Sequence, residues 1–324
     1  MIAKPASTAS PLFSVVIAVY NDWAPLDRCL HSLAQQFNAP GFEVIIVDDG
    51  SKQDAPECIG QWSTYYPLRL VTQVHAGIPA ARNRGVQLAT GAMLLFTDAD
   101  CRLQSNCLAA LAATVAKSPQ QNCFQLHLVG DCSRLTGKAE ELRLITLQNH
   151  LLQQDGRLRY LNTAGFAIRR SSIDRKQELF HPLALRGEDT LLLLELMDSG
   201  ELPLFVRDAI VEHAVTLSLF GCFVKDLRSA YLVRSAEQLI NKKRMRIRAT
   251  PGERLGMLCS MWKTAGQQAI GRLAWFVAVA RQLLQRILSN LFRIIGSGVA
   301  NSRGSTPIPG TMAHLEAPDR PSRP

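Results

Sequence analysis

The chain lacks the features that mark secreted or zinc-binding proteins. Its eight cysteines form no C-x-x-C pair, the spacing common in zinc sites and redox motifs. Residues 1–11 are small and polar, without the apolar core of a secretory signal peptide. These absences argue against a disulfide framework and against a zinc site. They predict a flexible N-terminal tail at residues 1–11 and reduced thiols in a cytoplasmic protein.

Long uncharged apolar runs are also missing from the C-terminal part of the chain. Arg272, Arg281, Arg286 and Arg293 interrupt its most apolar stretch, and only eight uncharged residues separate the first two. A membrane span needs about twenty apolar residues in a row, so this stretch does not predict one. The basic segment has few interleaved aromatic residues and no recognition motif, which makes nucleic acid an unfavoured partner.

The sequence does contain enough apolar material for a large core, and its charge is unevenly distributed. Hydrophobic residues make up 47% of the 324 residues, which suits one large α/β domain with an appendage. Residues 1–224 carry 19 Lys or Arg against 22 Asp or Glu, whereas residues 225–293 carry 14 against 3. The net charge of +9 therefore originates in the C-terminal part.

Apolar runs alternate with helix-like stretches near the start of the chain. Residues 13–20 read as a buried strand, residues 25–36 as a helix and residues 43–47 as a second strand. Such alternation predicts a doubly wound sheet flanked by helices. Ligands of these sheets bind beyond the carboxyl ends of the strands, which is where Asp49 and Asp98 fall.

Pairs of acidic residues follow two of the apolar runs. Asp98 and Asp100 come directly after residues 93–96, and on an ideal strand they would share one side of the backbone. Carboxylates are costly to bury without a counter-charge, and Mn²⁺ or Mg²⁺ shared with a diphosphate would supply one. The structural alternative is an Asp-rich turn, and it applies equally to Asp48 and Asp49.

Between these pairs, Gly77 and Pro79 predict a loop that leads into a short helix. Arg82 lies near the start of this helix and would reach an anionic group, since arginine pairs well with phosphate and carboxylate. A solvated arginine on the helix surface is the alternative. Each of these short segments is common in proteins when taken alone. Their order along the chain is therefore more informative about the fold than any one of them.

Five segments, taken in order, resemble an inverting family-2 glycosyltransferase of the GT-A fold. The resemblance covers roughly residues 12–215 and rests on the set rather than on one motif. The segments read VIAVYN (16–21), DDGS (48–51), AARNRG (80–85), DAD (98–100) and GEDT (187–190). The resemblance implies a nucleotide-binding mixed sheet, a nucleotide-sugar donor with uridine diphosphate as the family default, and Mn²⁺ or Mg²⁺ as cofactor.

The resemblance also implies roles for single residues on the donor side. Tyr20 would stack near the base, and Asp49 would accept a hydrogen bond from it. Asp48 would support the loop, and Arg82 would approach the base or the diphosphate. The implied donor-binding set is Ala18, Tyr20, Asp48, Asp49, Arg82 and Asp98.

For the metal, the resemblance implies Asp100 as the principal ligand, with Asp98 near the metal and the ribose. Cys101 stands where relatives often have aspartate or asparagine, and it has no assigned role. His213 follows a strand-like run, and some relatives place a metal-binding histidine near there. His213 is therefore a candidate ligand, with a structural histidine as the alternative.

The same resemblance assigns the catalytic base to Asp189. Glu188 and Asp189 precede the apolar run 191–197, so capping of a helix is the alternative for both. An inverting transfer needs one carboxylate to take the proton of the acceptor, on an element separate from the metal ligands. Asp189 meets this need.

The acceptor or sugar loop is predicted at Thr163, Ala164 and Gly165, together with Glu188. The resemblance places the first three in a loop and strand ahead of the base. Their small side chains would let a sugar approach the backbone. A tight turn before an edge strand is the alternative.

Other enzyme classes use similar groups. A nucleotidyltransferase would usually show a Gly-rich phosphate loop after the first strand, and none is present. A catalytically silent nucleotide-sugar-binding module is the other alternative, and the intact acids argue against it. A processive polysaccharide synthase would carry a Gln-x-x-Arg-Trp motif after Asp189, and it is missing. We therefore expect transfer of a single sugar.

The C-terminal part predicts a basic helical appendage at residues 216–296 and a disordered tail at 297–324. Residues 254–295 look helical, and over 282–295 polar and apolar side chains separate at helical spacing. Such a helix would lie peripherally in an anionic membrane surface, or pack its apolar face on the catalytic domain or on a second copy. The cytoplasmic face of a membrane would suit a lipid-linked acceptor of polysaccharide biosynthesis, with a free saccharide as the other acceptor class.

Overall fold

The computed structural model describes residues 10–173, 178–215, 217–242, 251–267 and 271–302. Its strands are β1 (Phe13–Val19), β2 (Phe42–Asp48), β3 (Leu68–Thr72), β4 (Met93–Asp98), β5 (Cys101–Leu103), β6 (Cys123–Gly130), β7 (Phe166–Arg169) and β8 (Leu204–His213). Its α-helices are α1 (Trp23–Ala34), α2 (Ile78–Leu88), α3 (Cys107–Lys117), α4 (Leu135–Leu151), α5 (Glu188–Asp198), α6 (Leu219–Lys242), α7 (Pro251–Gln267) and α8 (Arg272–Ser302).

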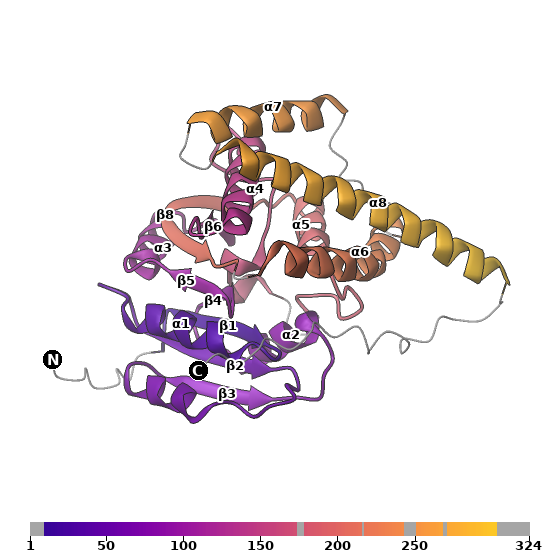
Figure 1. Ribbon diagram of the computed structural model, residues 1–324. Coiled ribbons are helices and arrows are strands. Elements are labelled where there is room, and N and C mark those ends of the chain that lie inside the picture. The colour runs from indigo at the N-terminus through magenta and orange to yellow at the C-terminus, as the bar shows by residue number, and fades with distance from the viewer. Residues whose placement is uncertain (1–9, 174–177, 216, 243–250, 268–270, 303–324) are drawn as a thin grey trace.

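The strands form one mixed sheet in the order β3-β2-β1-β4-β7-β6-β8-β5 (Figure 1). Strands β1 to β4 run parallel, β7 is antiparallel to both β4 and β6, and β5 is antiparallel to β8. Because β1 lies between β2 and β4, the carboxyl ends of all three meet at one edge of the sheet. The expected doubly wound mixed sheet is confirmed.

The sheet is covered on both faces, which explains why β1, β2 and β4 are almost continuously apolar. Alternate residues of β1 serve opposite faces. Val15 and Ile17 pack in one core with α1 and α3, and Val16 packs in a second core with α2 and α5. Strand β7 lies inside the sheet between β4 and β6, so the alternative of a turn before an edge strand does not apply.

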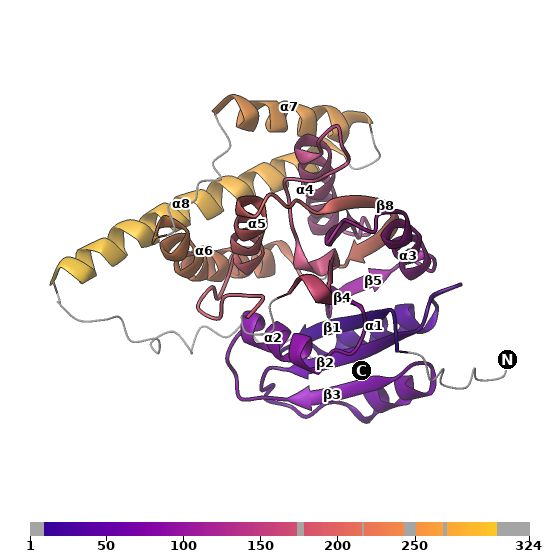
Figure 2. The ribbon, with the colours of Figure 1, turned by 180° about the vertical axis from the view of Figure 1, so that it is seen from behind.

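Helices α6, α7 and α8 pack against α4 and α5 on one side of the molecule (Figures 1 and 2). The stretch expected as one helix over 254–295 is two helices, α7 and α8. Gly271 precedes α8 with a φ of +86°, a conformation that favours glycine. The small residues Ala274 and Ala278 let α8 approach Ala139 of α4 closely. Within the described residues, no helix combines the length and hydrophobicity needed to cross a bilayer.

The expected boundaries fall partly outside the described residues. Residues 1–9 of the predicted N-terminal tail and residues 303–324 of the predicted C-terminal tail lie outside them. Helix α8 runs to Ser302, past the expected start of the tail at residue 297. The helical appendage is therefore longer than the sequence pattern indicated.

Candidate active site

A cleft of about 900 Å³ opens at the carboxyl ends of β1, β2 and β4. Helices α4, α5, α6 and α8 supply its remaining walls. Most of the residues singled out from the sequence line this cleft, and they are Ala18, Tyr20, Asp49, Arg82, Asp98, Asp100, Thr163, Ala164, Glu188, Asp189 and His213. Segments up to about 190 residues apart are thus brought together around one cavity.

Asp48 and Gly165 do not line the cleft. Asp48 Oδ1 accepts a hydrogen bond from the Ser51 backbone N–H at 2.9 Å, so Asp48 braces the loop after β2. A Cβ on Gly165 would come within 2.8 Å of Leu128 Cδ2. Glycine is therefore required there for packing against β6, and its role in a sugar loop stays a prediction.

The loops after β1 and β2 are joined by Asn21. Its backbone N–H donates to Ser51 Oγ, and its Oδ1 accepts from the Lys52 backbone N–H, both at 2.8 Å. Asn21 has a φ of +55°, a left-handed conformation that asparagine tolerates better than most residues. These bonds fix the rim of the cleft next to Tyr20 and Asp49.

Asp49 is buried, and its carboxylate is surrounded by side-chain and backbone groups of residues 73–77. Oδ1 accepts from Gln73 Nε2 at 2.8 Å and from the Ala76 backbone N–H at 2.9 Å. Oδ2 accepts from the Gly77 backbone N–H at 2.8 Å and lies 2.8 Å from His75 Nδ1. A carboxylate offers about four acceptor positions, so all of them are engaged.

His75 is a site residue that sequence reasoning missed. Its ring stacks on that of Tyr20, with centroids 4.3 Å apart and an interplanar angle of 25°. The histidine side chain is half exposed and lines the cleft together with Tyr20. A lone histidine in a loop carries no periodic signal, so only the fold could identify this pair.

Arg82 ties three elements together below the cleft. Its Nη1 donates to Glu188 Oε1 of α5 at 2.6 Å, and its Nη2 donates to Asp98 Oδ1 of β4 at 2.8 Å. Arg82 and Glu188 are both almost completely buried. Burial opposes the charge of Arg82, but Asp98 and Glu188 together raise its pKa. The guanidinium is thus committed to two carboxylates of the protein.

Asp98 and Asp100 do not share a strand, contrary to expectation. β4 ends at Asp98, the chain turns, and β5 begins at Cys101. The backbone turn therefore sets the direction of Asp100, and the alternation of a strand does not apply. Both carboxylates nevertheless line the cleft.

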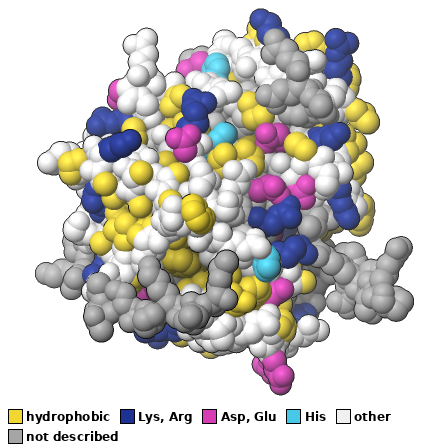
Figure 3. Space-filling view, turned by 90° about the vertical axis from the view of Figure 1, so that its left-hand side faces the viewer, with side chains coloured by type: hydrophobic (Ala, Val, Ile, Leu, Met, Phe, Trp, Pro, Cys, Tyr) yellow, Lys and Arg dark blue, Asp and Glu magenta, His cyan; other side chains and the backbone are white. Residues whose placement is uncertain are grey.

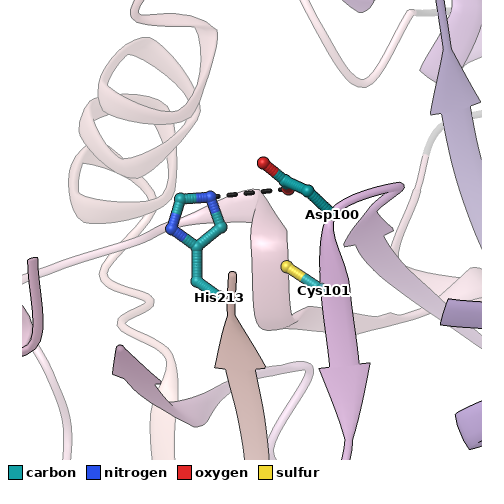
Figure 4. A group of neighbouring side chains, drawn as sticks. All are labelled: Asp100, Cys101 and His213. Carbon is teal, nitrogen blue, oxygen red and sulfur yellow. Dashed lines mark ion pairs between the residues drawn. The ribbon is translucent and has the colours of Figure 1, made fainter. Parts of the chain in front are cut away.

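Asp100, Cys101 and His213 form a group whose ligand atoms all lie within 4.8 Å of one another (Figure 4). Cys101 and His213 are paired residues of β5 and β8. His213 Nε2 lies 3.5 Å from Asp100 Oδ1, and His213 Nδ1 lies 3.7 Å from Glu140 Oε1 of α4. The imidazole is therefore held between two carboxylates.

The chemistry of this group suits a hard divalent cation. Burial raises the pKa of Asp100, but the charge and hydrogen bond of His213 and the charge of Lys225 bring it down to about 2. Carboxylate oxygen and imidazole nitrogen are ligands that Mn²⁺ accepts. Burial raises the pKa of the Cys101 thiol well above its ordinary value, so Cys101 stays a neutral, soft group and a poor ligand for such an ion.

Asp189 lies at the start of α5, on a different element from the group formed by Asp100, Cys101 and His213. Gly187 precedes the helix with a φ of +86°, and Asp189 Oδ1 accepts from the Thr190 backbone N–H at 2.7 Å. Burial, followed by the charge of Glu188, raises the pKa of Asp189 to about 6. A carboxylate with this pKa is a stronger base than usual and is still mostly ionised at neutral pH.

The C-terminal helices contribute groups that the sequence did not assign to the site. Lys225 and Arg228 of α6 and Gln282 and Gln285 of α8 line the cleft. Arg281 of α8 donates two hydrogen bonds to Asp226, at 2.8 and 2.9 Å, which fastens α8 to α6. The helical appendage is therefore part of the wall of the cleft.

Comparison with protein families identifies the N-terminal half of the chain. The model for "Glycosyl transferase family 2" matches residues 14–177, about half of the chain. Among curated proteins, glycosyltransferase AglE of Haloferax volcanii is 37% identical over 94 residues. That match covers 28% of this chain and 31% of AglE, so it spans about a third of the relative.

Solved glycosyltransferase structures share the fold. Mannosyltransferase PcManGT from Pyrobaculum calidifontis, solved with GDP-Man and Mn²⁺, covers 91% of this chain and 81% of its own at 18% identity and a TM-score of 0.56. The fragment TarS 1–349 from S. aureus, solved with UDP-GlcNAc, matches 90% of this chain and 92% of the fragment at 14% identity and a TM-score of 0.51. By its family match and its fold, the chain belongs to glycosyl transferase family 2 and has the GT-A fold.

Proposed function

We propose that the protein transfers a single sugar from a nucleotide-sugar donor, a uridine diphosphate sugar by the default of its family, to an acceptor hydroxyl with inversion. One observation carries this proposal. A carboxylate with the pKa of a general base, Asp189, and the Asp100–His213 group lie on separate elements and line the same cleft. The nucleotide sugars bound by PcManGT and TarS support the class of donor.

On the donor side, we place the base of the nucleotide against Tyr20 and beside Asp49. The half-exposed His75 stacks on the ring of Tyr20 and contacts one carboxylate oxygen of Asp49. A planar base that displaced His75 would gain both the stacking surface and a free acceptor. The backbone N–H groups of Ala76 and Gly77 keep Asp49 in place during this exchange.

Asp100 and His213, with Asp98, would hold Mn²⁺ or Mg²⁺. Arg82 occupies Oδ1 of Asp98, and Oδ2 accepts no hydrogen bond from a described residue. Bound there, the cation would neutralise charge on the leaving diphosphate. PcManGT was solved with Mn²⁺, which supports the choice of a divalent ion.

At the reacting centre, the acceptor oxygen forms a bond to the anomeric carbon while the bond from that carbon to the diphosphate oxygen breaks. The electron pair of the broken bond leaves with the diphosphate. Asp189 takes the proton of the acceptor hydroxyl. Attack from the face opposite the leaving group inverts the configuration, and a base on α5, apart from the metal-ligand group, suits this direction of attack.

We place the acceptor, a saccharide or a lipid-linked saccharide, against the wall formed by α6 and α8. Lys225 and Arg228 present two cations there, three residues apart on one side of α6. Gln282 and Gln285 offer amide groups from α8, which suit sugar hydroxyls. Thr163 and Ala164 line the floor between this wall and the strand ends.

The test compares Asp189→Asn with the wild-type chain and with Asp198→Asn, an exposed carboxylate on the same helix. Release of nucleoside diphosphate is measured with a panel of nucleotide sugars, with Mn²⁺ or Mg²⁺ and with saccharide and lipid-linked acceptors. We expect Asp189→Asn to lose about 10³-fold in transfer rate and to bind nucleotide normally in calorimetry. Wild-type turnover by Asp189→Asn would remove the assignment of the base.

A further inference from the structure

Helix α8 carries an apolar stripe that faces away from the protein. Five large side chains along it are 48–64% exposed, and we call them the α8 stripe: Leu273, Phe276, Leu283, Ile287 and Leu291. Their spacings of three, four and seven residues place them on one face of the helix. At 1.5 Å per residue the stripe is about 27 Å long.

The opposite face of α8 holds the helix on the protein, mainly through small and polar side chains, with Trp275 and Val277 packed beside them. Ala274 and Ala278 are buried against α4, and Arg281 pairs with Asp226 of α6. Gln282 and Gln285 face the cleft. A helix that served only to cover the catalytic domain would turn its large apolar residues inward. Here they point outward, so the amphipathic pattern serves a partner outside the chain.

An aromatic group marks the N-terminal end of the stripe. The ring centroid of Trp262 of α7 lies 4.9 Å from that of Trp275 and 6.2 Å from that of Phe276. The guanidinium of Arg272 lies 5.0 Å from the centroid of the Trp262 ring. Trp262 is 37% exposed. Tryptophan next to arginine is typical of segments that lie at a boundary between water and lipid.

The net charge of the C-terminal helices favours an anionic lipid surface over a second copy of the chain as the partner. Helices α6, α7 and α8 carry ten Lys or Arg and three Asp or Glu. A second copy docked on the same stripe would bring two such basic regions together, whereas an anionic lipid surface would be attracted to them. The face shown in Figure 3 differs, because basic and acidic side chains are interspersed there among hydrophobic ones.

We propose that the α8 stripe docks the protein on an anionic lipid surface, with α8 lying along it. Figure 1 shows α8 along the outer side of the helical region, extending beyond the other helices at its C-terminal end. The stripe enters the boundary between headgroups and acyl chains, and Trp262 and Arg272 anchor one end. Because the inner face of α8 lines the cleft, docking places the cleft next to the lipid headgroups.

The experiment is flotation of the full chain with vesicles of phosphatidylcholine alone or of equal parts phosphatidylcholine and phosphatidylglycerol. We expect flotation with the anionic vesicles and its loss at high salt. The variant Leu283→Glu/Ile287→Glu should lower the partition coefficient by at least about tenfold, since it removes two apolar contacts and adds two negative charges. The control Phe37→Glu/Tyr65→Glu changes two side chains of similar exposure away from α8 and should float normally.

Thermal melting verifies that the variants fold, which the exposure of the substituted side chains favours. A second measurement needs no substitution: nitroxide-labelled lipid should quench the neighbouring Trp262 and Trp275, while Trp23 and Trp62 stay buried in the core. Normal flotation of Leu283→Glu/Ile287→Glu, or equal binding of the wild type to both kinds of vesicle, would overturn the proposal. A wild-type dimer that does not float, and that this variant converts to monomer, would assign the stripe to a second copy instead. None of these readouts depends on transferase activity.

Discussion

The two sides of the cleft differ in how their charged groups are satisfied. On the side of the strand ends, Asp49 is surrounded by donors of its own loop, and Arg82 is bound by Asp98 and Glu188. On the side of the helices, Lys225 and Arg228 form no ion pair with any described residue. We call these the strand-end wall and the helical wall.

This difference divides the work of the site between the walls. Charges that are already bound within the protein stay in place when a ligand arrives, so the strand-end wall would offer the proposed nucleotide a preorganised pocket. Groups that react or that select an acceptor must stay available, and such groups often have shifted pKa values, as Asp189 does. The strand-end wall thus resembles a fixed scaffold, and the helical wall carries the cations that remain available to a ligand.

Removal of the buried Arg82 from the strand-end wall should have the largest effect, and this effect is on stability. Arg82→Met leaves the buried Glu188 without its partner, and removal of one member of a buried pair costs about 3–5 kcal/mol. We expect the free energy of unfolding in urea to fall by about this amount. Arg84→Met, an exposed position on the same helix, should change it little.

A second substitution tests the cause of this loss. In Arg82→Met/Glu188→Gln the unpaired charge is gone, so part of the lost stability should return. If Arg82→Met is as stable as Arg84→Met, the two walls do not differ in the way described, and Arg82 is free for the nucleotide.

Loss of the proposed metal ligand Asp100 at the strand-end wall should have the second largest effect. Asp100→Ala removes the carboxylate of the proposed ligand group, and groups around a metal commonly change affinity by about 10- to 100-fold. In the presence of Mn²⁺, we expect Asp100→Ala to bind UDP or GDP at least about tenfold more weakly than the wild type does. Without Mn²⁺, the variant and the wild type should bind equally well. Calorimetry measures both, with the exposed Asp155→Ala as control. An equal loss with and without Mn²⁺ would contradict a metal role.

The strand-end wall was largely predictable from the sequence. Buried parallel strands show as apolar runs, and their carboxyl ends meet at one edge, so Asp49 and Asp98 are identifiable from the end of each run. The prediction went wrong where the backbone leaves the strand. Asp100 follows a turn, and Gly165 meets Leu128 across the sheet, so neither obeys the geometry of an ideal strand or of an open loop.

The helical wall was much less predictable, for a physical reason. Helical periodicity shows which residues share a face, but the direction of that face depends on tertiary packing. The amphipathic pattern of α8 was visible, yet packing through Ala274 and Ala278 turns its large apolar residues outward. Lys225 and Arg228 enter the cleft only because α6 folds back over residues far away in the sequence.

The pH dependence of transfer tests the base on the helical wall. The proposed base, Asp189, would act as the carboxylate, and its pKa is raised to about 6. Below this pH kcat/KM should fall about tenfold per unit, and above it the rate should level off. Glu188→Gln removes a charge that raises this pKa and frees Arg82, so the acid limb should move to lower pH. A wild-type acid limb near the ordinary pKa of aspartate would show that burial of Asp189 does not control the reaction.

The smallest effect should come from the two cations of the helical wall. Lys225→Gln/Arg228→Gln removes two exposed charges, and exposed ion pairs are typically worth about 0.2–1 kcal/mol each. We expect the KM of an anionic acceptor from the screen to rise by about fivefold, with kcat and the KM of the donor unchanged. Because the charge of Lys225 also acts on Asp100, all constants are measured at saturating Mn²⁺. Arg234→Gln, on the same helix but outside the cleft, is the matched control. A rise in the KM of the donor instead would assign these cations to the diphosphate. The strand-end wall would then not bind the donor alone, and α6 would close over the nucleotide as well as the acceptor.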